Sequence, residues 1–597
     1  MRRTQARIHL RNEAHALITS ETAKHLPAEI GGVLLGYRED ADIIVTHALV
    51  VGGKLASANR YVRDDVKANE LLRAFLKERA DDDPIGYIGE WHSHPAPCGP
   101  SPTDVDAIRA TAKSAAAAIA LLVHIPSNPA AFSGIIASRH RLGRVSTRAA
   151  TVSLPQSRFP PLEQLPDGAV RGDGPVFVSY RQSDGTAAAD SLEGLLRAAG
   201  LVVWRDRTDL RAGTTTDRLE QALTQGLSAA VLIVTPDIVH SEIVRERELP
   251  RLLQLDADPA FSLCIANHVA RSPNNSRCDF EAPDRLLRTA PARTLADKKQ
   301  TNMLDPAGEV EIARDLLMHR VEQRKSLIRQ QDRRFTIRVQ SRPTPFAIDA
   351  GEDDLHIRLS VASAGRLPSP KGLKLLQTTL PLISDAVYAT GAKTVRIAGG
   401  AHLSVSLALG AALPETKIGT LEVLDVQDQM WSSLAGDKLS TNDVHIEPID
   451  IKTLSTAGRE RIAVFVSLTP DPDRTAFERL IQESPDGFAA AAIVSTEPNS
   501  RIDAREAGRL SAAVAQAIKR LAASSGRAEI HLAFHGPYTM AALTGRYLNT
   551  LRTVIYEWED ETADGPTYTP VIVLEPGTVG GPITDVVAYT HVWRPGA

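Results

Sequence analysis

The chain has 597 residues, of which 43% are hydrophobic and 23% are charged, and its formal net charge at pH 7 is −4. A chain of this length is too long to fold around one hydrophobic core, which predicts about three to five domains. The small net charge argues against a DNA or membrane partner, and three widely spaced cysteines exclude a disulfide framework. Without an apolar signal core or an apolar run of about 18 residues, we expect a soluble, cytoplasmic, multidomain α/β protein.

The first segment, residues 1–150, carries two histidines that can share a metal ion. The stretch IGYIGEWHSHP reads as a strand, which directs His92 and His94 to the same face. Asp104, at the start of a helical pattern, can supply a third ligand. Three protein ligands leave one tetrahedral position of Zn²⁺ open for a water molecule, and a zinc-bound water can attack a carbonyl.

This chemistry also needs a general base, for which the sequence offers two glutamates. Glu29 precedes an apolar strand, and Glu90 lies on the same strand face as His92. A Glu, a His-x-His-Pro and a Ser-x-x-Asp in this order resemble the JAB/JAMM metallopeptidases. The resemblance implies a JAB/MPN α+β fold and a peptide or isopeptide substrate, such as a ubiquitin-like conjugate. It implies zinc ligands His92, His94 and Asp104, Glu29 as the base, and Ser101 at the oxyanion, with Glu90 as the competing base.

Residues 151–173 are predicted to form a linker, because PQSRFPPLEQLPDG is rich in proline and lacks helical or strand periodicity. In the next segment, residues 174–255, apolar runs alternate with helical patterns. This alternation predicts parallel strands joined by crossover helices. Ligands of such sheets lie beyond the carboxyl ends of the strands, where the sequence places Ser179, Tyr180, Arg181 and Asp206.

The runs VFVSY and VVWRD, the second followed by Leu210 and Gly213, resemble the first two boxes of a TIR domain. The resemblance implies a flavodoxin-like fold and cleavage of NAD⁺ at the nicotinamide–ribose bond. Ser179, Tyr180, Arg181 and Asp206 would then line the pocket. A carboxylate would stabilise the positive charge that develops on the ribose. In HSEIVRERELP the candidates are Glu248, which keeps the Glu-Leu pair of the family, and Glu246.

Residues 256–334 are predicted to be a connecting segment with a helical pattern at Val310–Gln331. Four basic residues lie on this pattern: Arg320, Arg324, Lys325 and Arg329. They indicate either a solvated bridging helix or a basic wall that faces a ligand.

Residues 335–597 contain an internal repeat. TVRIAGGAHLSVSLALGAAL and, about 135 positions later, EIHLAFHGPYTMAALTGRYL each combine a strand, a turn with Gly and His, and a helix of small residues. Gly410 and Gly545 would allow close helix packing. Two such halves face to face predict a pocket in which two helix N-termini point at a shared phosphate. The turn residues are Gly399, Gly400 and His402 in the first copy and His535 and Gly536 in the second.

This segment resembles the SAVED domain, the sensor of bacterial cyclic-oligonucleotide (CBASS-like) antiphage systems. The resemblance implies two fused Rossmann-like (CARF-like) halves that bind a cyclic di-, tri- or tetranucleotide. By position, the ligand contacts would include Arg396, Trp431 and the turn residues. The histidines are equally suited to capping a helix, and Trp431 is equally suited to the core.

Together the three resemblances predict an antiphage effector whose TIR unit hydrolyses NAD⁺ after a cyclic oligonucleotide binds the SAVED unit and drives self-association. A JAMM zinc peptidase is an additional activity in this hypothesis. The alternative is a cyclic-nucleotide-regulated JAMM protease or deconjugase in which the TIR unit is a non-catalytic assembly module. A pure scaffold would require both enzyme sites to be dead, against which the complete His92, His94 and Asp104 set argues.

Overall fold

The computed structural model divides the chain into two compact units, Met1–Pro160 and Pro161–Ala597. Among the residues that it describes, no helix is both long enough and apolar enough to cross a membrane. The described residues are 7–39, 42–57, 60–77, 84–96, 98–115, 117–126, 131–140, 143–154, 162–205, 215–241, 243–272, 275–287, 294–343, 353–362, 366–434, 444–451, 461–470, 473–484, 487–496, 502–548, 550–559, 565–575 and 577–587.

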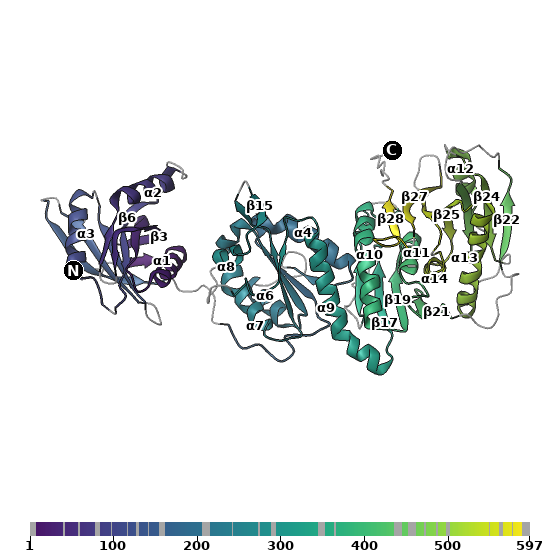
Figure 1. Ribbon diagram of the computed structural model, residues 1–597, viewed down its shortest axis with the longest axis horizontal. Coiled ribbons are helices and arrows are strands. Elements are labelled where there is room, and N and C mark those ends of the chain that lie inside the picture. The colour runs from purple at the N-terminus through teal and green to yellow at the C-terminus, as the bar shows by residue number, and fades with distance from the viewer. Residues whose placement is uncertain are drawn as a thin grey trace. The chain divides into compact units, whose positions relative to one another are not determined.

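The first unit is a closed barrel with strand order β1-β3-β2-β6-β7-β8-β9, drawn in purple and blue in Figure 1. The apolar strand β7 has core residues on both faces, because α1 contributes to the core on one side and α3 to the core on the other. The elements are β1 (Arg7–Leu10), α1 (Asn12–His25), β2 (Gly31–Glu39), β3 (Asp42–Val51), β4 (Gly53–Ser57), β5 (Arg60–Arg63), α2 (Asp65–Lys77), β6 (Gly86–Ser93), α3 (Pro102–Ser114), β7 (Ile119–Ile125), β8 (Ala131–Arg139) and β9 (Val145–Ser153).

In the wall of this barrel, strand β6 lies between β2, to which it is antiparallel, and β7, to which it is parallel. The barrel closes where β1 pairs with β9, whose last residue is Ser153. The first residues of the predicted linker therefore belong to the barrel.

The second unit begins with a five-stranded parallel sheet of order β11-β10-β12-β13-β16. This is the flavodoxin-like order, and β12 is buried along its length as expected for a central strand. Strands β13 and β16 lie in the segment predicted to be connecting. The elements are β10 (Val176–Ser179), α4 (Gln182–Ala198), β11 (Val203–Trp204), α6 (Thr215–Thr224), β12 (Ala229–Val234), η1 (Pro236–His240), η2 (Val244–Glu248), α7 (Leu249–Leu255), β13 (Ser262–Asn267), β14 (Ala270–Ser272), β15 (Asn275–Cys278), α8 (Ala282–Leu287), β16 (Gln300–Asn302) and α9 (Gly308–Gln331).

Two further sheets form the rest of the second unit. The first has the order β18-β17-β19-β20-β21 and the second has the order β22-β24-β23-β25-β26-β27-β28. The elements are β17 (Phe335–Gln340), β18 (Leu355–Arg358), α10 (Pro370–Thr390), β19 (Thr394–Gly400), α11 (Leu403–Ala412), β20 (Thr420–Leu424), β21 (Met430–Ser432), β22 (His445–Ile449), β23 (Arg461–Ser467), α12 (Thr475–Glu483), β24 (Ala490–Ser495), η3 (Ala504–Glu506), α13 (Ala507–Ser524), β25 (Glu529–His535), α14 (Tyr538–Gly545), β26 (Thr553–Glu559), β27 (Thr567–Leu574) and β28 (Ile583–Val586).

Helices α11 and α14 lie side by side between these two sheets (Figure 1) and hold the two halves together. A Cβ atom on Gly410 would lie 2.0 Å from the carbonyl oxygen of Ala542, and one on Gly545 would lie 2.2 Å from that of Leu407. Both glycines are therefore needed for the close approach of the helices, which confirms their predicted role.

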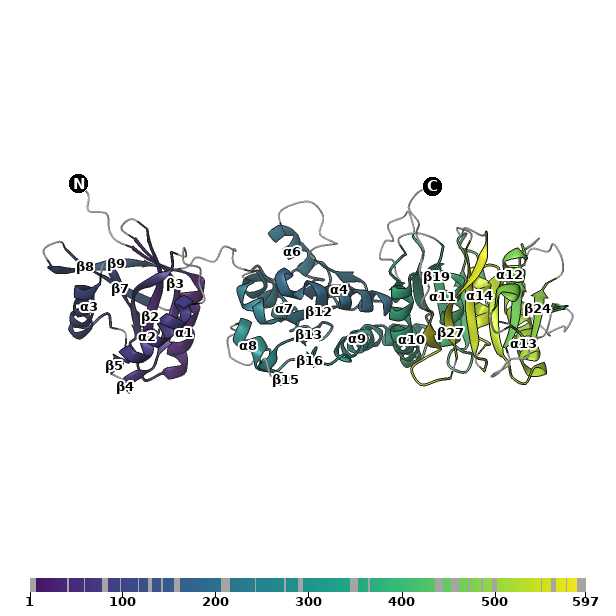
Figure 2. The ribbon, with the colours of Figure 1, turned by 90° about the horizontal axis from the view of Figure 1, so that it is seen from above.

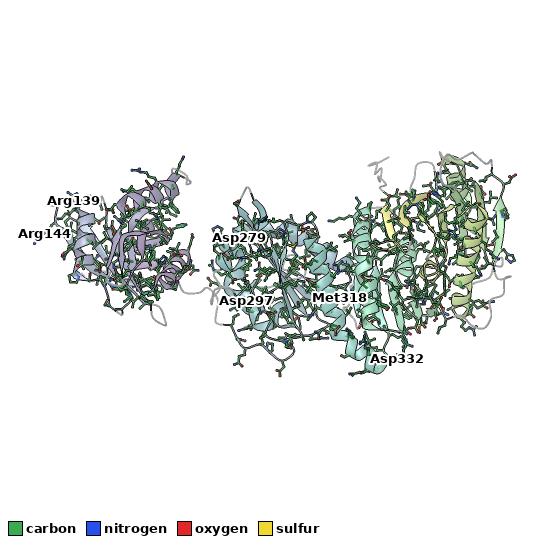
Figure 3. All side chains as sticks on the ribbon, viewed as in Figure 1. Arg139, Arg144, Asp279, Asp297, Met318 and Asp332 are labelled. Carbon is green, nitrogen blue, oxygen red and sulfur yellow. The ribbon has the colours of Figure 1, made fainter. Side chains whose placement is uncertain are left out.

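Helix α9 connects the parallel sheet to the first of the two C-terminal sheets. Figure 3 labels Met318 on this helix and Asp332 at its end. Arg320 is 4% exposed and donates to the carbonyl oxygens of Asp173, at 2.6 Å, and Gly174. Arg324 pairs with Asp173 and with the buried Asp354, at 3.3 and 3.4 Å. Arg320 and Arg324 thus link the two sheets, whereas Lys325 pairs with Glu322 of the same helix. The helix bridges as one alternative predicted, but Arg320 is buried and the side chain of Arg324 is only 12% exposed, so neither is a solvated residue.

The parallel sheet and the first C-terminal sheet share one hydrophobic core. Residues of β10 and α4, of α9, and of β18 and α10 all belong to it. Figure 2 shows α9 beside α10. At the end of α4, Gly200 accepts the N–H of His356 at 2.7 Å, and Ala198 accepts the hydroxyl of Thr379 at 3.1 Å. The two sheets therefore pack against each other through one continuous core and are joined by these hydrogen bonds.

We predict that Gly410→Ala destabilises the second unit. Alanine in an exposed helix interior is normally favoured over glycine by about 1 kcal/mol, but here the added methyl group meets the Ala542 carbonyl, and overpacking costs roughly 1–3 kcal/mol. Thermal unfolding of the full chain measures the effect. The control is Gly194→Ala in α4, whose Cβ would meet only Leu375 Cδ1, at 3.4 Å. A melting temperature of Gly410→Ala equal to or above that of the wild type would contradict the close packing of α11 and α14.

Candidate functional site

Three potential metal ligands meet at the end of β6 in the first unit. His92 is the penultimate residue of this strand, His94 follows the strand, and Asp104 lies in the first turn of α3. The His92 Nε2 and His94 Nε2 atoms are 3.0 Å apart, and they lie 3.4 and 3.5 Å from the carboxylate oxygens of Asp104. Among the described residues these side chains form the one group of at least three that could hold a metal ion.

The ligand atoms lie close enough to share one metal ion. Around a tetrahedral zinc with bonds of about 2.0–2.1 Å, neighbouring ligand atoms lie about 3.3 Å apart. The two histidine nitrogens are 3.0 Å apart, and each approaches a different oxygen of Asp104, at 3.4 and 3.5 Å. His94 Nδ1 is 3.0 Å from the backbone carbonyl of Cys98, which fixes the tautomer that leaves Nε2 free to bind a metal. The donor set of two imidazoles and one carboxylate is one that zinc accepts.

Ser101 and Asp104 hold each other in a capping box at the start of α3. The Ser101 N–H donates to Asp104 Oδ2 at 2.7 Å, and the Ser101 hydroxyl accepts the Asp104 N–H at 3.2 Å. Burial would raise the pKa of Asp104, but the hydrogen bonds and charge of His92 and the bonds from Ser101 lower it far below its usual value. The carboxylate is therefore ionised and fixed in place. The Ser101 hydroxyl can still donate one hydrogen bond.

Glu29 and Glu90 both line the cleft of about 820 Å³ that contains these histidines, but their surroundings differ. Glu29 is 9% exposed, and burial raises its pKa, although His94 and His92 oppose the shift. A raised pKa suits a carboxylate that accepts a proton. Glu90 is instead paired with Arg63 at 2.7 Å and accepts the Tyr87 hydroxyl at 3.1 Å. The geometry favours Glu29 over Glu90 as the base.

Tyr61 is a residue of this cleft that the sequence analysis missed. Its backbone N–H bonds the Glu29 carboxylate, and its ring is stacked against His92 with 6.3 Å between centroids. The ring fits there because residue 31 is glycine: a Cβ on Gly31 would lie 2.6 Å from Tyr61 Cε1. In the sequence, the Gly31-Gly32 pair was the feature that could have indicated a bulky side chain packed at this position.

The second candidate site lies at the carboxyl end of β10. The Ser179 hydroxyl donates to the carboxylate of Glu248, and both residues are buried, with 1% and 6% exposure. Glu248 ends a π-helical turn, a geometry that is frequent at functional sites. Glu246, two residues earlier, has a side chain that is 22% exposed and lies 3.8 Å from Arg245. The structure thus brings Glu248, and not Glu246, to Ser179.

The other residues predicted for this site are only partly brought together. Tyr180 is 6% exposed and belongs to the core, with the Arg205 guanidinium 4.5 Å from its ring centroid. Arg181 precedes α4 and donates to the carbonyl oxygen of Asp237. Asp206 lies outside the described residues. Arg205, which the sequence analysis did not select, is 2% exposed and pairs with Glu193 at 2.9 Å.

At the first strand–helix turn of the repeat, the histidine and one glycine have structural partners. His402 is 4% exposed, and its Nδ1 is 2.8 Å from the Ser341 hydroxyl. Burial lowers the pKa of His402 to about 4, so the ring is neutral at pH 7. Gly399 has φ +105°, and a Cβ there would lie 2.3 Å from the Val339 carbonyl oxygen. The Cβ of residue 400 would face open space.

The prediction that both helix N-termini are open to a shared phosphate is wrong for α11. The Glu557 carboxylate, from β26 in the other half, accepts the N–H and the hydroxyl of Ser404 at 2.7 and 2.6 Å. This buried carboxylate satisfies donors that were expected to face the ligand. Its position in the run YEW, which follows the second copy of the repeat, was the sequence signal for this contact.

The remaining predicted ligand contacts fall in different places. His535 is half-buried, with burial lowering its pKa, and Gly536 is close to Leu468, to whose Cβ an added Cβ would lie at 3.0 Å. Trp431 is 6% exposed, belongs to the hydrophobic core and donates its indole N–H to Asp425 at 3.1 Å. Of the two alternatives, its position fits a core residue. Arg396 pairs with Glu422 at 2.8 Å in a separate cleft.

Trp558 is a more accessible aromatic side chain than Trp431. It is half-buried, and the Arg366 guanidinium lies over its ring, 4.8 Å from the centroid. The ring also packs against the hydrophobic cluster that contains Phe465 and Tyr568.

Three family models match the chain. Residues 11–142 match the prokaryotic homologues of the JAB domain, residues 176–266 match the TIR domain, and residues 379–574 match SAVED, the SMODS-associated sensor domain that is fused to various effectors. The probable metalloprotease y4qB of Sinorhizobium fredii is 34% identical over 135 residues, which are 21% of this chain and 82% of that protein.

Two solved structures show more distant similarity. The Cap4 SAVED/CARF-domain containing receptor of Acinetobacter baumannii, solved with the cyclic trinucleotide 3'3'3'-cAAA, is 13% identical and covers 66% of this chain and 99% of its own, with a TM-score of 0.32. A protein of Desulfitobacterium hafniense is 19% identical over 25% of this chain and 93% of its own, with a TM-score of 0.20. By its N-terminal region the chain belongs to the prokaryotic JAB family, and it joins this domain to a TIR domain and a SAVED sensor domain.

Proposed function

We propose that the chain is a CBASS-like antiphage effector in which binding of a cyclic oligonucleotide to the SAVED domain activates NAD⁺ hydrolysis by the TIR domain. In this proposal the JAB domain is residues 1–150, the TIR domain begins at 174, and the SAVED domain is residues 335–597. Ligand binding drives self-association of chains, which completes the NAD⁺ pocket. The chain acts in the cytoplasm.

The observation that carries this proposal is the shared core of the TIR and SAVED domains. One hydrophobic cluster includes residues of β10, which ends at Ser179, and residues of α11 and α14, which form the centre of the sensor. A ligand acts through a difference in affinity between two states, and a continuous core supports the transfer of such a difference from the sensor to the enzyme.

In this proposal Glu248 is the carboxylate that stabilises the positive charge on the ribose during NAD⁺ cleavage. A buried carboxylate at the carboxyl end of a parallel strand stabilises positive charge on a ribose better than one in water, because the local dielectric constant is low. The bond from Ser179 holds this carboxylate at the sheet edge where ligands of such folds bind.

The JAB domain supports a second candidate activity, zinc-dependent cleavage of a peptide or isopeptide bond. The favouring observation is that two imidazoles and one carboxylate lie close enough to share one ion. His92, His94 and Asp104 would hold the ion, which when bound supplies a water of lowered pKa and polarises a carbonyl. Glu29 would accept a proton at its carboxylate, and the Ser101 hydroxyl would donate to an oxyanion.

We predict that the purified chain binds about one zinc ion and that His92→Ala abolishes binding. Loss of a ligand should cost more than the roughly 10–100-fold in affinity that follows loss of a residue that only orients one. Glu29→Gln and Glu90→Gln serve as controls, because neither side chain belongs to the ligand group. Elemental analysis after dialysis against a weak chelator measures zinc; full occupancy in His92→Ala would refute the site.

We expect NAD⁺ consumption by the full chain to depend on a cyclic nucleotide. The protein is incubated with NAD⁺ and with each member of a panel of cyclic di-, tri- and tetranucleotides, and the remaining NAD⁺ is measured. At least one member should raise the rate by about fivefold or more, the lower end of typical allosteric coupling. Equal rates with and without every member would reject gating by the sensor.

The catalytic assignment predicts different effects for the two glutamates. Glu248→Gln removes the buried charge and should lower the activated rate of NAD⁺ cleavage by at least about 100-fold, as for loss of other electrostatic contacts to a transition state. Glu246→Gln, the matched control, should retain most of the rate. If only Glu246→Gln loses activity, the roles are reversed. If neither does, the TIR domain has no catalytic glutamate here, which favours the assembly-module alternative.

A further inference from the structure

The cleft at the metal centre of the first unit continues past the metal ligands, between β6 and α3. On β6, Glu90 and His92 both line it; they are two residues apart on one strand face, roughly 7 Å along the strand. On α3, Thr103, Ala107 and Thr111 line it at intervals of four residues, so they share one face of the helix. This stripe begins next to the metal ligand of the helix and ends where the Thr111 hydroxyl bonds Glu90. The cleft therefore runs from the metal ligands to Glu90.

The carboxylate of Glu90 is held by three neighbours at one of its two oxygens. Arg63 Nη1 lies 2.7 Å from Oε1, and the hydroxyls of Tyr87 and Thr111 donate to the same atom at 3.1 and 3.3 Å. The other oxygen, Oε2, has no such contact among the residues that the structure describes. The side chain is 19% exposed. The carboxylate is thus fixed in direction, and Oε2 keeps its capacity to accept a hydrogen bond.

The charge of the cleft favours a cationic donor for this oxygen. Among the described residues that line the cleft, four carboxylates accompany one guanidinium. A doubly charged ion at the metal centre would still leave a negative balance, which attracts cationic groups and disfavours acidic ones. A charge-assisted hydrogen bond from an ammonium or guanidinium group is also stronger than one from a neutral donor. The charged residues are Glu29, Asp65, Glu90, Asp104 and Arg63.

The lining of α3 and β7 leaves space for an apolar stem between the metal ligands and Glu90. Ala107 has only a methyl group, and the buried side chains of Ile108 and Leu121 also line the cleft. Lysine and arginine place three or four methylene groups along apolar surface and direct a charged head to a polar partner. The separation of roughly 7 Å along the strand between Glu90 and His92 is one that such a stem can span.

We propose that Glu90 is a specificity residue of the JAB domain, whose Oε2 accepts a hydrogen bond from a lysine or arginine side chain next to the scissile bond. This inference rests on the peptidase activity proposed for that domain. It narrows the substrate class to peptides or conjugates with a basic residue beside the bond that is cut. Glu90 then has a role in binding instead of proton transfer, and Arg63, Tyr87 and Thr111 are the positioning residues that fix its direction.

The first test is the cleavage preference of the zinc-loaded full chain. A randomised peptide library, analysed by mass spectrometry, gives the bonds that are cut. Matched peptides then carry lysine or norleucine, or arginine or citrulline, beside the cut bond. The wild type should cleave the basic member with a kcat/KM at least about tenfold higher, the usual effect of a hydrogen bond to a charged group. Glu90→Gln should reduce this ratio to about twofold or less. The control Asp106→Asn changes an exposed carboxylate of α3 outside the cleft lining and should keep the ratio.

The second test measures binding without cleavage. The variant Glu29→Gln, which lacks the proposed base, is titrated into fluorescently labelled members of each peptide pair, and anisotropy gives the affinity. The basic peptide should bind at least about tenfold more tightly than its neutral counterpart, and addition of Glu90→Gln should abolish the difference. If Glu90→Gln fails to fold because Arg63 loses a partner, the double variant Arg63→Gln/Glu90→Gln removes both charges and replaces it in both tests.

The outcomes separate this inference from the activity on which it rests. If the wild type cleaves both members of each pair equally, the inference is overturned and the peptidase activity stands. The same conclusion follows if Glu90→Gln keeps the wild-type preference and only lowers the melting temperature, because Glu90 is then purely structural. If no peptide is cut but basic peptides bind Glu29→Gln through Glu90, the peptidase activity falls and the cation site stands. If neither cleavage nor preferential binding occurs, both fall.

Discussion

The hydrogen bonds from the buried Arg320 guanidinium to the carbonyl oxygens of Asp173 and Gly174 join α9 to the segment that precedes β10, inside the continuous core of the second unit. Burial lowers the pKa of Arg320 to about 10, so the group stays charged at pH 7 and must keep its acceptors. Removing those acceptors would leave a buried charge uncompensated, which is strongly unfavourable. Helix α9 is therefore fixed to the segment that enters β10, and β10 leads directly to Ser179 and Glu248.

The metal centre is organised on a different principle, because all of its parts come from one short stretch of the first unit. Strand β6 presents His92, the loop after it returns the Cys98 carbonyl to His94, and the cap of α3 fixes Asp104. Glu29, the proposed base, is the exception: it lies just before β2, and the Tyr61 N–H bonds its carboxylate. Every described residue of this site thus belongs to the first unit.

The sensor combines a symmetric backbone with asymmetric electrostatics. The Gly410 and Gly545 contacts place α11 and α14 symmetrically. Among the described residues, however, a glutamate from the other half bonds only the start of α11, where Glu557 accepts the Ser404 N–H. Arg546 adds a second asymmetry at the other end, because it is 1% exposed and donates to the Leu413 carbonyl at the end of α11. The two copies of the repeat thus share a backbone arrangement but differ in the side chains that contact the ends of their helices.

The sequence by itself determined the features that depend on local spacing. The alternation of a strand places His92 and His94 on one face, the Ser-x-x-Asp spacing builds a capping box, and the repeat marks both packing glycines. Only the tertiary structure decided which glutamate meets Ser179, that Trp431 is in the core, and that Glu557 closes α11. These contacts join residues 69 and 153 positions apart. Local periodicity carries no information about such pairs, because they are set by how whole sheets and helices pack.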